Sequence, residues 1–70
     1  MMRYALLYER LSIETHRLET VVVHYAEGTI TSERRSIIAA PRGDAETLMI
    51  AQGWQYRNTP GPQSILMQHA

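Results

Sequence analysis

The sequence predicts a single α+β domain over residues 1–70, in which one helix packs on one face of a small, mostly antiparallel β-sheet. Three observations predict this class and the order β-β-β-α-β-β along the chain. Residues 44–54, DAETLMIAQGW, combine a helix start signal, a helical period and a stop signal. Residues 2–9 alternate in side-chain character, and residues 20–23 are a threonine followed by three valines; both patterns are typical of strands.

Composition limits the possible classes of function. The chain has no cysteine, which excludes disulfides, thiolate zinc sites and a cysteine nucleophile. Seven arginines balance seven carboxylates, so the broad attraction behind non-specific nucleic-acid binding is missing. No apolar run approaches the ~18 residues of a membrane helix, and the N-terminus lacks the long apolar segment of a secretion signal. We therefore expect a cytoplasmic protein with no membrane partner.

The first strand is predicted over residues 2–9, because its side chains alternate between two faces. The face that we expect to pack on the core carries Met2, Tyr4, Leu6 and Tyr8. Residues 10–17 are polar and have no clean period, which predicts a connection.

Residues 19–30 fit two structures. A helix from Ile13 to Glu27, begun by Ser12 and ended by Gly28, would place apolar side chains on one side. The consecutive valines, however, are stiff at χ1 and favour a strand, and residues 26–29 fit a tight hairpin turn. We predict the hairpin.

The predicted hairpin has a definite register, with Tyr25 opposite Ile30, Val23 opposite Ser32, Val21 opposite Arg34 and Val22 opposite Glu33. The adjacent Arg34 and Arg35 are expected on a solvated strand face with cross-strand partners such as Glu19, or alternatively at an interface with a carboxylate-bearing partner. A helix over residues 33–40, begun by Ser32 and ended by Pro41, is the alternative for the returning segment.

The helix that follows is predicted to start at Asp44, whose carboxylate would accept hydrogen bonds from the first turn. Glu46 adds negative charge near the positive end of the helix dipole, and Gly53 ends the helix in the left-handed conformation. Ile50 falls between polar residues and is expected to lack a place in the core. The predicted apolar side consists of Ala45, Leu48, Met49 and Ala51.

Two closing strands are predicted at residues 54–57 and 64–68. The prolines in residues 59–62 indicate a loop between them rather than a two-residue turn. The side chains expected to face the core are Trp54 and Tyr56, with Ile65 and Met67, or with Leu66 if the register shifts by one.

The end of the chain, residues 44–68, resembles a small bacterial and phage domain family of unknown function. The shared features are a helix, then Ala51-Gln52-Gly53-Trp54 in the place of an "EGW"-like motif, and a closing hairpin with a glycine in its turn. Gln52 stands where that family tends to have an acidic residue. Because the family has no established activity, the resemblance implies a fold and no functional residues.

Residues with catalytic or metal-binding chemistry do not form a recognisable set. On one extended strand His16 and His24 would lie about 26 Å apart, too far to share a metal. None of the serines stands in a nucleophile elbow, and no glycine-rich phosphate loop is present. We expect no catalytic residue, no metal and no cofactor, and hence not an enzyme.

The leading functional hypothesis is a small protein-binding module. Its most concrete form is an inhibitor of a host protein complex, encoded by a phage or mobile element and similar in kind to anti-CRISPR proteins. The alternative is a self-associating structural or regulatory subunit, active as a homodimer. Nucleic-acid binding through Arg34, Arg35 and Arg42 ranks lower. The candidate interface residues are Ile50, Glu46, Val22, Glu33, Arg34, Arg35 and Arg42.

Overall fold

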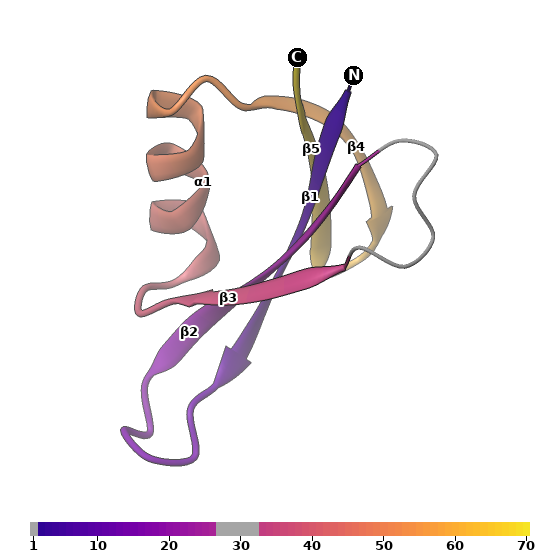
Figure 1. Cartoon of the computed structure of the whole chain (residues 1–70). Coiled ribbons are helices and arrows are strands. Elements are labelled where there is room, and N and C mark those ends of the chain that lie inside the picture. Colours follow the sequence, from indigo (N-terminus) through magenta and orange to yellow (C-terminus); the bar gives the residue numbers. More distant parts are fainter. Residues whose placement is uncertain (1, 27–32) are drawn as a thin grey trace.

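A computed structural model describes residues 2–26 and 33–70 of the chain. Five antiparallel strands form one sheet, and one helix covers one of its faces (Figure 1). The elements are β1 (Arg3–Leu11), β2 (Leu18–Ala26), β3 (Arg34–Ile38), α1 (Arg42–Ala51), β4 (Gln55–Gly61) and β5 (Ser64–His69). The predicted α+β class and the order β-β-β-α-β-β are therefore confirmed.

β1 is the central strand, because the order across the sheet is β3-β2-β1-β5-β4. It pairs with β2 on one side and with β5 on the other, so the first and last strands of the chain lie next to each other. The two chain ends consequently lie close together (Figure 1). Among the described residues, no helix is long and apolar enough to cross a membrane.

The core lies between α1 and the face of the sheet that carries Ala5 and Leu7, both of which are fully buried. From the helix, Ala45 and Met49 pack into this core. The prediction that the tyrosine face of β1 packs on the core was wrong. Alternation shows only which residues share a face, and the small Ala5 and Ala45 let the helix approach the sheet closely on this side.

β2 is a strand, as predicted, and the helical alternative for residues 33–40 was wrong because β3 lies there. The predicted register was also wrong. Val21 lies opposite Ile37 and Val22 opposite Ser36, three positions beyond the predicted partners. This register places the apolar end of β3, Ile37 and Ile38, opposite Val21 and Thr20. The predicted partner of Val23, Ser32, was wrong as well, because Val23 lies opposite Arg35. The predicted turn at residues 26–29 and the predicted partner of Tyr25, Ile30, lie outside the described residues.

α1 begins at Arg42, and the predicted cap at Asp44 was wrong. Pro41 occupies the N-cap position without a side-chain cap hydrogen bond. The Arg42 backbone N–H instead donates to the Glu9 carboxylate of β1, over 2.9 Å. A partner from a distant strand thus replaces the local cap, and Asp44 acts only as an acidic residue in the first turn, an effect of about 0.3–1 kcal/mol.

The end of α1 follows the prediction closely. Gly53 has φ +98°, in the left-handed region, and Trp54 directly after it is only 7% exposed. The Trp54 backbone N–H donates to the Met49 carbonyl, which fixes the turn from helix to strand. Ile50 lies outside the core, as predicted, and is 46% exposed; Leu48, expected in the core, is equally exposed.

β4 and β5 are joined by two residues, so the prediction of a longer loop was wrong. β4 continues through Pro60 to Gly61, which lies opposite Ser64. The pairing of β4 with β5 shifts register twice, between Tyr56 and Asn58 and between Asn58 and Gly61. β4 is an edge strand, and the side without a neighbouring strand tolerates a proline that has no N–H to donate. Met67 is fully buried and Ile65 packs against the core, as predicted, whereas Tyr56 is 55% exposed.

Candidate functional site

The face of the sheet opposite α1 is apolar, and no described helix or strand packs on it. We call it the open face. By strand alternation and register its central side chains are Tyr4, Leu6, Tyr8, Val21, Val23, Tyr25, Ile37 and Leu66. An antiparallel sheet with one face in water normally carries polar side chains on that face. The apolar character of this one therefore marks it as a candidate binding surface.

The open face is already well packed. Val21 lies between Tyr8 and Ile37 of the neighbouring strands and is only 2% exposed, although no described element covers it. The Tyr4 and Tyr25 rings stack with their centroids 5.4 Å apart. These contacts hold the aromatic side chains in place, so a partner would meet a surface that needs little reordering.

Charged side chains surround the apolar centre of the open face. Arg10 and Glu19 form an ion pair across β1 and β2, with Nε and Oε2 2.8 Å apart. The expected partnership of Glu19 with the arginines of β3 was therefore wrong. Arg35 lies 3.9 Å from Glu33, and Arg57 places its guanidinium carbon 5.4 Å from the Tyr4 ring centroid. An apolar centre with a charged rim is the usual composition of a protein interface.

The hairpin of β1 and β2 extends beyond the helix (Figure 1). Its tip exposes three apolar side chains among polar and charged ones, because Ile13 is 92% exposed, Leu11 60% and Leu18 43%. Between this tip and β3 lies a hollow of about 350 Å³, lined by Arg10, Leu11, Ser12, Ile13, Glu14, Glu19 and Ile37. The hollow extends the open face and has room for an apolar side chain of a partner.

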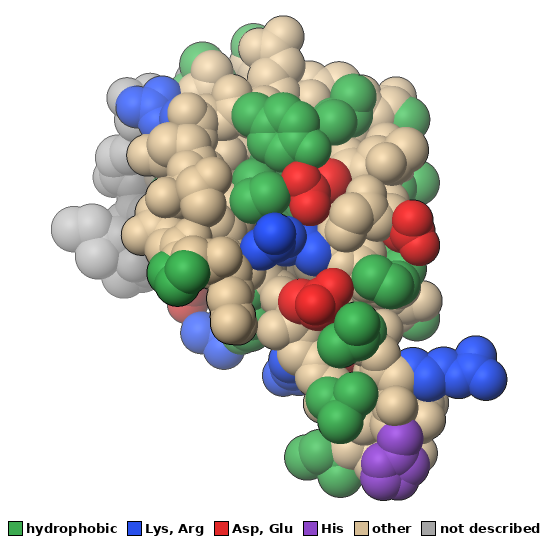
Figure 2. All heavy atoms as spheres, turned by 180° about the vertical axis from the view of Figure 1, so that it is seen from behind, with side chains coloured by type: hydrophobic (Ala, Val, Ile, Leu, Met, Phe, Trp, Pro, Cys, Tyr) green, Lys and Arg blue, Asp and Glu red, His purple; other side chains and the backbone are tan. Residues whose placement is uncertain are grey.

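On the face seen in Figure 2, acidic and basic side chains adjoin at the centre among hydrophobic ones. Glu46 accepts a hydrogen bond from the Tyr56 hydroxyl, over 2.7 Å, and its Oε2 lies 3.3 Å from Arg42 Nε. The hydrogen bond to Glu46 raises the pKa of Tyr56, with burial and the Glu46 charge adding to the effect. Glu46 and Arg42 are both predicted interface residues, but their contacts here are intramolecular. They connect α1 to β1 and β4.

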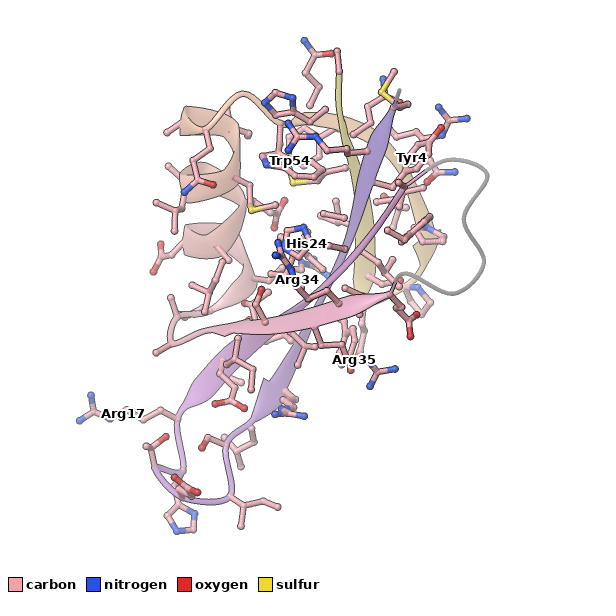
Figure 3. All side chains as sticks on the ribbon, in the orientation of Figure 1. Tyr4, Arg17, His24, Arg34, Arg35 and Trp54 are labelled. Carbon is pink, nitrogen blue, oxygen red and sulfur yellow. The ribbon has the colours of Figure 1, made fainter. Side chains whose placement is uncertain are left out.

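The remaining predicted interface residues do not share one surface. Val22 is fully buried in the core, so the expectation that it lacks an internal partner was wrong. Arg34 lies beside His24 on the helix side of β3, whereas the adjacent Arg35 points away from it (Figure 3). Ile50 lies on the outer side of α1. Since Arg42 is held at the start of α1, the three arginines proposed for nucleic-acid binding form no common basic patch.

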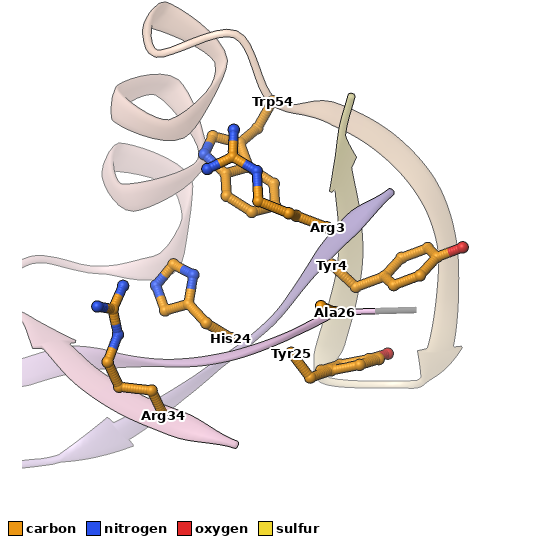
Figure 4. Close-up of a pocket in the computed structure, with 7 residues that line it drawn as sticks. All are labelled: Arg3, Tyr4, His24, Tyr25, Ala26, Arg34 and Trp54. Carbon is orange, nitrogen blue, oxygen red and sulfur yellow. The ribbon is translucent and has the colours of Figure 1, made fainter. Parts of the chain in front are cut away.

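A separate cleft lies on the helix side, at the ends of β1 and β2. It has a volume of about 340 Å³ and is lined by Arg3, Tyr4, His24, Tyr25, Ala26, Arg34 and Trp54. Arg3 and Trp54 lie on one side of it and His24 and Arg34 on the other, while the Tyr4 and Tyr25 rings point away (Figure 4). Sequence patterns gave no signal for this cleft, because its side chains come from separate segments.

Aromatic and cationic groups pack tightly around Trp54. The Arg3 guanidinium carbon lies 5.7 Å from the Trp54 ring centroid, and Arg3 Nη2 lies 3.0 Å from His69 Nδ1. The rings of His24 and His69 meet Trp54 edge-on, at 5.8 and 5.3 Å between centroids. Burial lowers the pKa of His24 from its ordinary value of 6.5, and the charges of Arg34 and Arg3 lower it further.

The lowered pKa of His24 predicts a pH-dependent stability. As the pH falls through 6.5, the unfolded chain binds more protons than the folded one, so His24 should reduce the stability below that pH and not above it. We expect the loss in free energy of unfolding between about pH 7.5 and about pH 5.5 to shrink in His24→Gln. Urea unfolding at both pH values measures it. The control is His16→Asn, because His16 lies in an exposed loop with φ +58°, which asparagine tolerates. If the pH-dependent loss in free energy of unfolding shrinks equally in both variants, His24 is not its source.

A scan against protein-family models, a search of curated proteins and a search of solved structures each returned no significant match. The resemblance of residues 44–68 to a small bacterial and phage family stays a prediction on sequence grounds. Any function must therefore be argued from the surfaces described above.

Proposed function

We propose that this chain is a small, non-enzymatic protein-binding module whose binding surface is the open face together with the tip of the β1–β2 hairpin. The observation that carries the proposal is the apolar face of tyrosine, leucine and isoleucine that no described element covers. Tyrosines supply large contact areas at low entropic cost and are enriched in interfaces. The hollow beside Ile37 and Ile13 offers a place for one anchoring side chain of the partner.

The partner that fits this surface is another protein with an apolar centre and acidic side chains at its rim. Arg57 lies beside Tyr4 and donates one hydrogen bond, from Nη1 to Gln68 Oε1, while among the described residues Arg35 has only a long contact with Glu33, at 3.9 Å. Both guanidiniums therefore keep donors for carboxylates of a partner. Arg10, in contrast, already has a short ion pair with Glu19. A homodimer through the same face is the alternative, supported by the small core of a 70-residue chain without disulfides.

The proposal predicts that a charged side chain introduced on the open face weakens binding, whereas one introduced on the outer side of α1 does not. Ile37→Asp and Ile50→Asp form a matched pair, because the two side chains are 53% and 46% exposed and lie on opposite sides of the molecule. Sedimentation velocity at micromolar concentration tests self-association. A partner purified from a lysate of the source cells is then titrated by calorimetry, and we expect Ile37→Asp to weaken its binding by at least about tenfold.

Circular dichroism and urea unfolding confirm first that both variants remain folded. Binding that tolerates Ile37→Asp but fails with Ile50→Asp would move the interface to the outer side of α1. A chain that neither self-associates nor retains any partner would contradict the proposal.

The narrower hypothesis of a phage or mobile-element inhibitor, of the anti-CRISPR kind, rests on the size of the chain and on the lack of a recognisable catalytic set in the sequence. It is supported if the gene lies among phage or plasmid genes and if the partner isolated above is a host complex whose activity the chain inhibits.

A further inference from the structure

We propose that the cleft between Trp54 and Arg34 binds a small phosphate monoester, with its phosphate group held between the guanidiniums of Arg3 and Arg34 and beside His24. The cleft lies on the helix side of the sheet and shares with the open face only Tyr4 and Tyr25, whose rings point away from the cleft (Figure 4). Its occupancy is therefore independent of the protein-binding function proposed above, and either proposal can fail without the other.

The donors of this site come from three adjacent strands. Arg3 belongs to β1, His24 to β2 and Arg34 to β3, and His24 and Arg34 are directly opposite each other in the sheet. The described residues that line the cleft include no carboxylate. In the described part of the chain, the ion pairs engage Arg10, Arg35 and Arg42, all of them outside the cleft. Guanidinium groups are well suited to phosphate because they offer several donors in one plane.

The positions of these donors favour phosphate over a carboxylate. Arg3 and Arg34 flank the cleft from opposite sides (Figure 4), so a ligand between them must accept hydrogen bonds from two directions. A phosphate monoester presents three oxygens around the phosphorus atom, whereas a carboxylate presents two in one plane.

The cleft also has room for the organic part of the ligand. Its volume of about 340 Å³ exceeds that of a phosphate group and lies at the lower end of the range for small-molecule sites. Trp54 and Ala26 supply apolar lining. Trp54 itself is held by the aromatic contacts with both histidines, so this lining is formed before a ligand arrives.

His24 gives the site a specific reporter. The ionisable side chains around it in the described structure are Arg34 on β3, Arg3 on β1 and His69 on β5, which contacts Arg3 and Trp54; no side chain of α1 lines the cleft. The two arginines oppose protonation of His24. A bound phosphate dianion would offset their charges and raise the pKa of His24, with uptake of a proton.

The test uses the intact chain, with phenyl phosphate, inorganic phosphate and acetate as probes at matched ionic strength. The histidine resonances are followed by NMR through a pH titration, and affinities are measured by calorimetry. We expect phenyl phosphate to bind more tightly than inorganic phosphate, to raise the pKa of His24 and to leave the resonances of His16, in the hairpin tip, unperturbed.

Two neighbouring variants separate a site from general charge attraction. Arg34→Gln should weaken phenyl phosphate binding by at least about tenfold, whereas Arg35→Gln, on the opposite side of the same strand, should change it by less than about twofold. Equal weakening by both variants, no shift of the His24 pKa or equal binding of acetate would each overturn the proposal.

Discussion

Trp54→Ala should leave most of the chain unfolded at room temperature. The indole is 7% exposed and joins α1, β1, β2 and β5, through contacts with Met49, Arg3, His24 and His69. Removing a buried tryptophan typically costs about 3–5 kcal/mol. A core of this size rarely supplies more than roughly 3–5 kcal/mol in total, so the loss is comparable to the whole stability.

Far-UV circular dichroism and urea unfolding would measure this effect, with Trp54→Phe as the matched control, because phenylalanine keeps an aromatic ring in the same place. We expect the control to remain folded and to lose clearly less than Trp54→Ala. The native protein should also show a blue-shifted tryptophan emission that moves to longer wavelength on unfolding. A native emission typical of exposed tryptophan, or a Trp54→Ala variant as stable as the control, would contradict the buried position.

The parts of the fold that the sequence predicts correctly depend on neighbouring residues. The end of α1 is an example, since Gly53 can adopt a positive φ and the aromatic Trp54 follows it at once. The strand at the valines was likewise predicted from local preference, against a helical period that fitted almost as well.

The parts that the sequence does not predict depend on residues far apart in the chain. The cap of α1 comes from Glu9, 33 positions before Arg42. The register of β2 and β3 differs by three positions from the one predicted with a tight turn at residues 26–29. The cleft brings Arg3, His24 and Arg34 together only because β1, β2 and β3 are adjacent in the sheet. In the sequence, His24 can be weighed only as a metal ligand, because its position beside two arginines has no local signature.

The two faces of β1 provide the sharpest contrast with the sequence prediction. Leu6 and Leu7 are adjacent and chemically identical, yet Leu7 is fully buried under α1 whereas Leu6 is half-buried on the open face. Leu7→Ala leaves a cavity between sheet and helix and should cost about 2–5 kcal/mol. Leu6→Ala leaves no closed cavity in the described fold, because no described element lies above it, and should cost about 1 kcal/mol.

Urea unfolding of both variants, at a low and at a tenfold higher protein concentration, distinguishes the two faces and tests the binding proposal at once. If the chain is a monomer, the order of the two losses should be the same at both concentrations. If the open face forms a homodimer, the loss for Leu6→Ala should grow with concentration, because wild type gains stability from association through this face and the variant gains less. A larger loss for Leu6→Ala than for Leu7→Ala at the low concentration would mean that the tyrosine face, and not the face under α1, contains the core of the isolated chain.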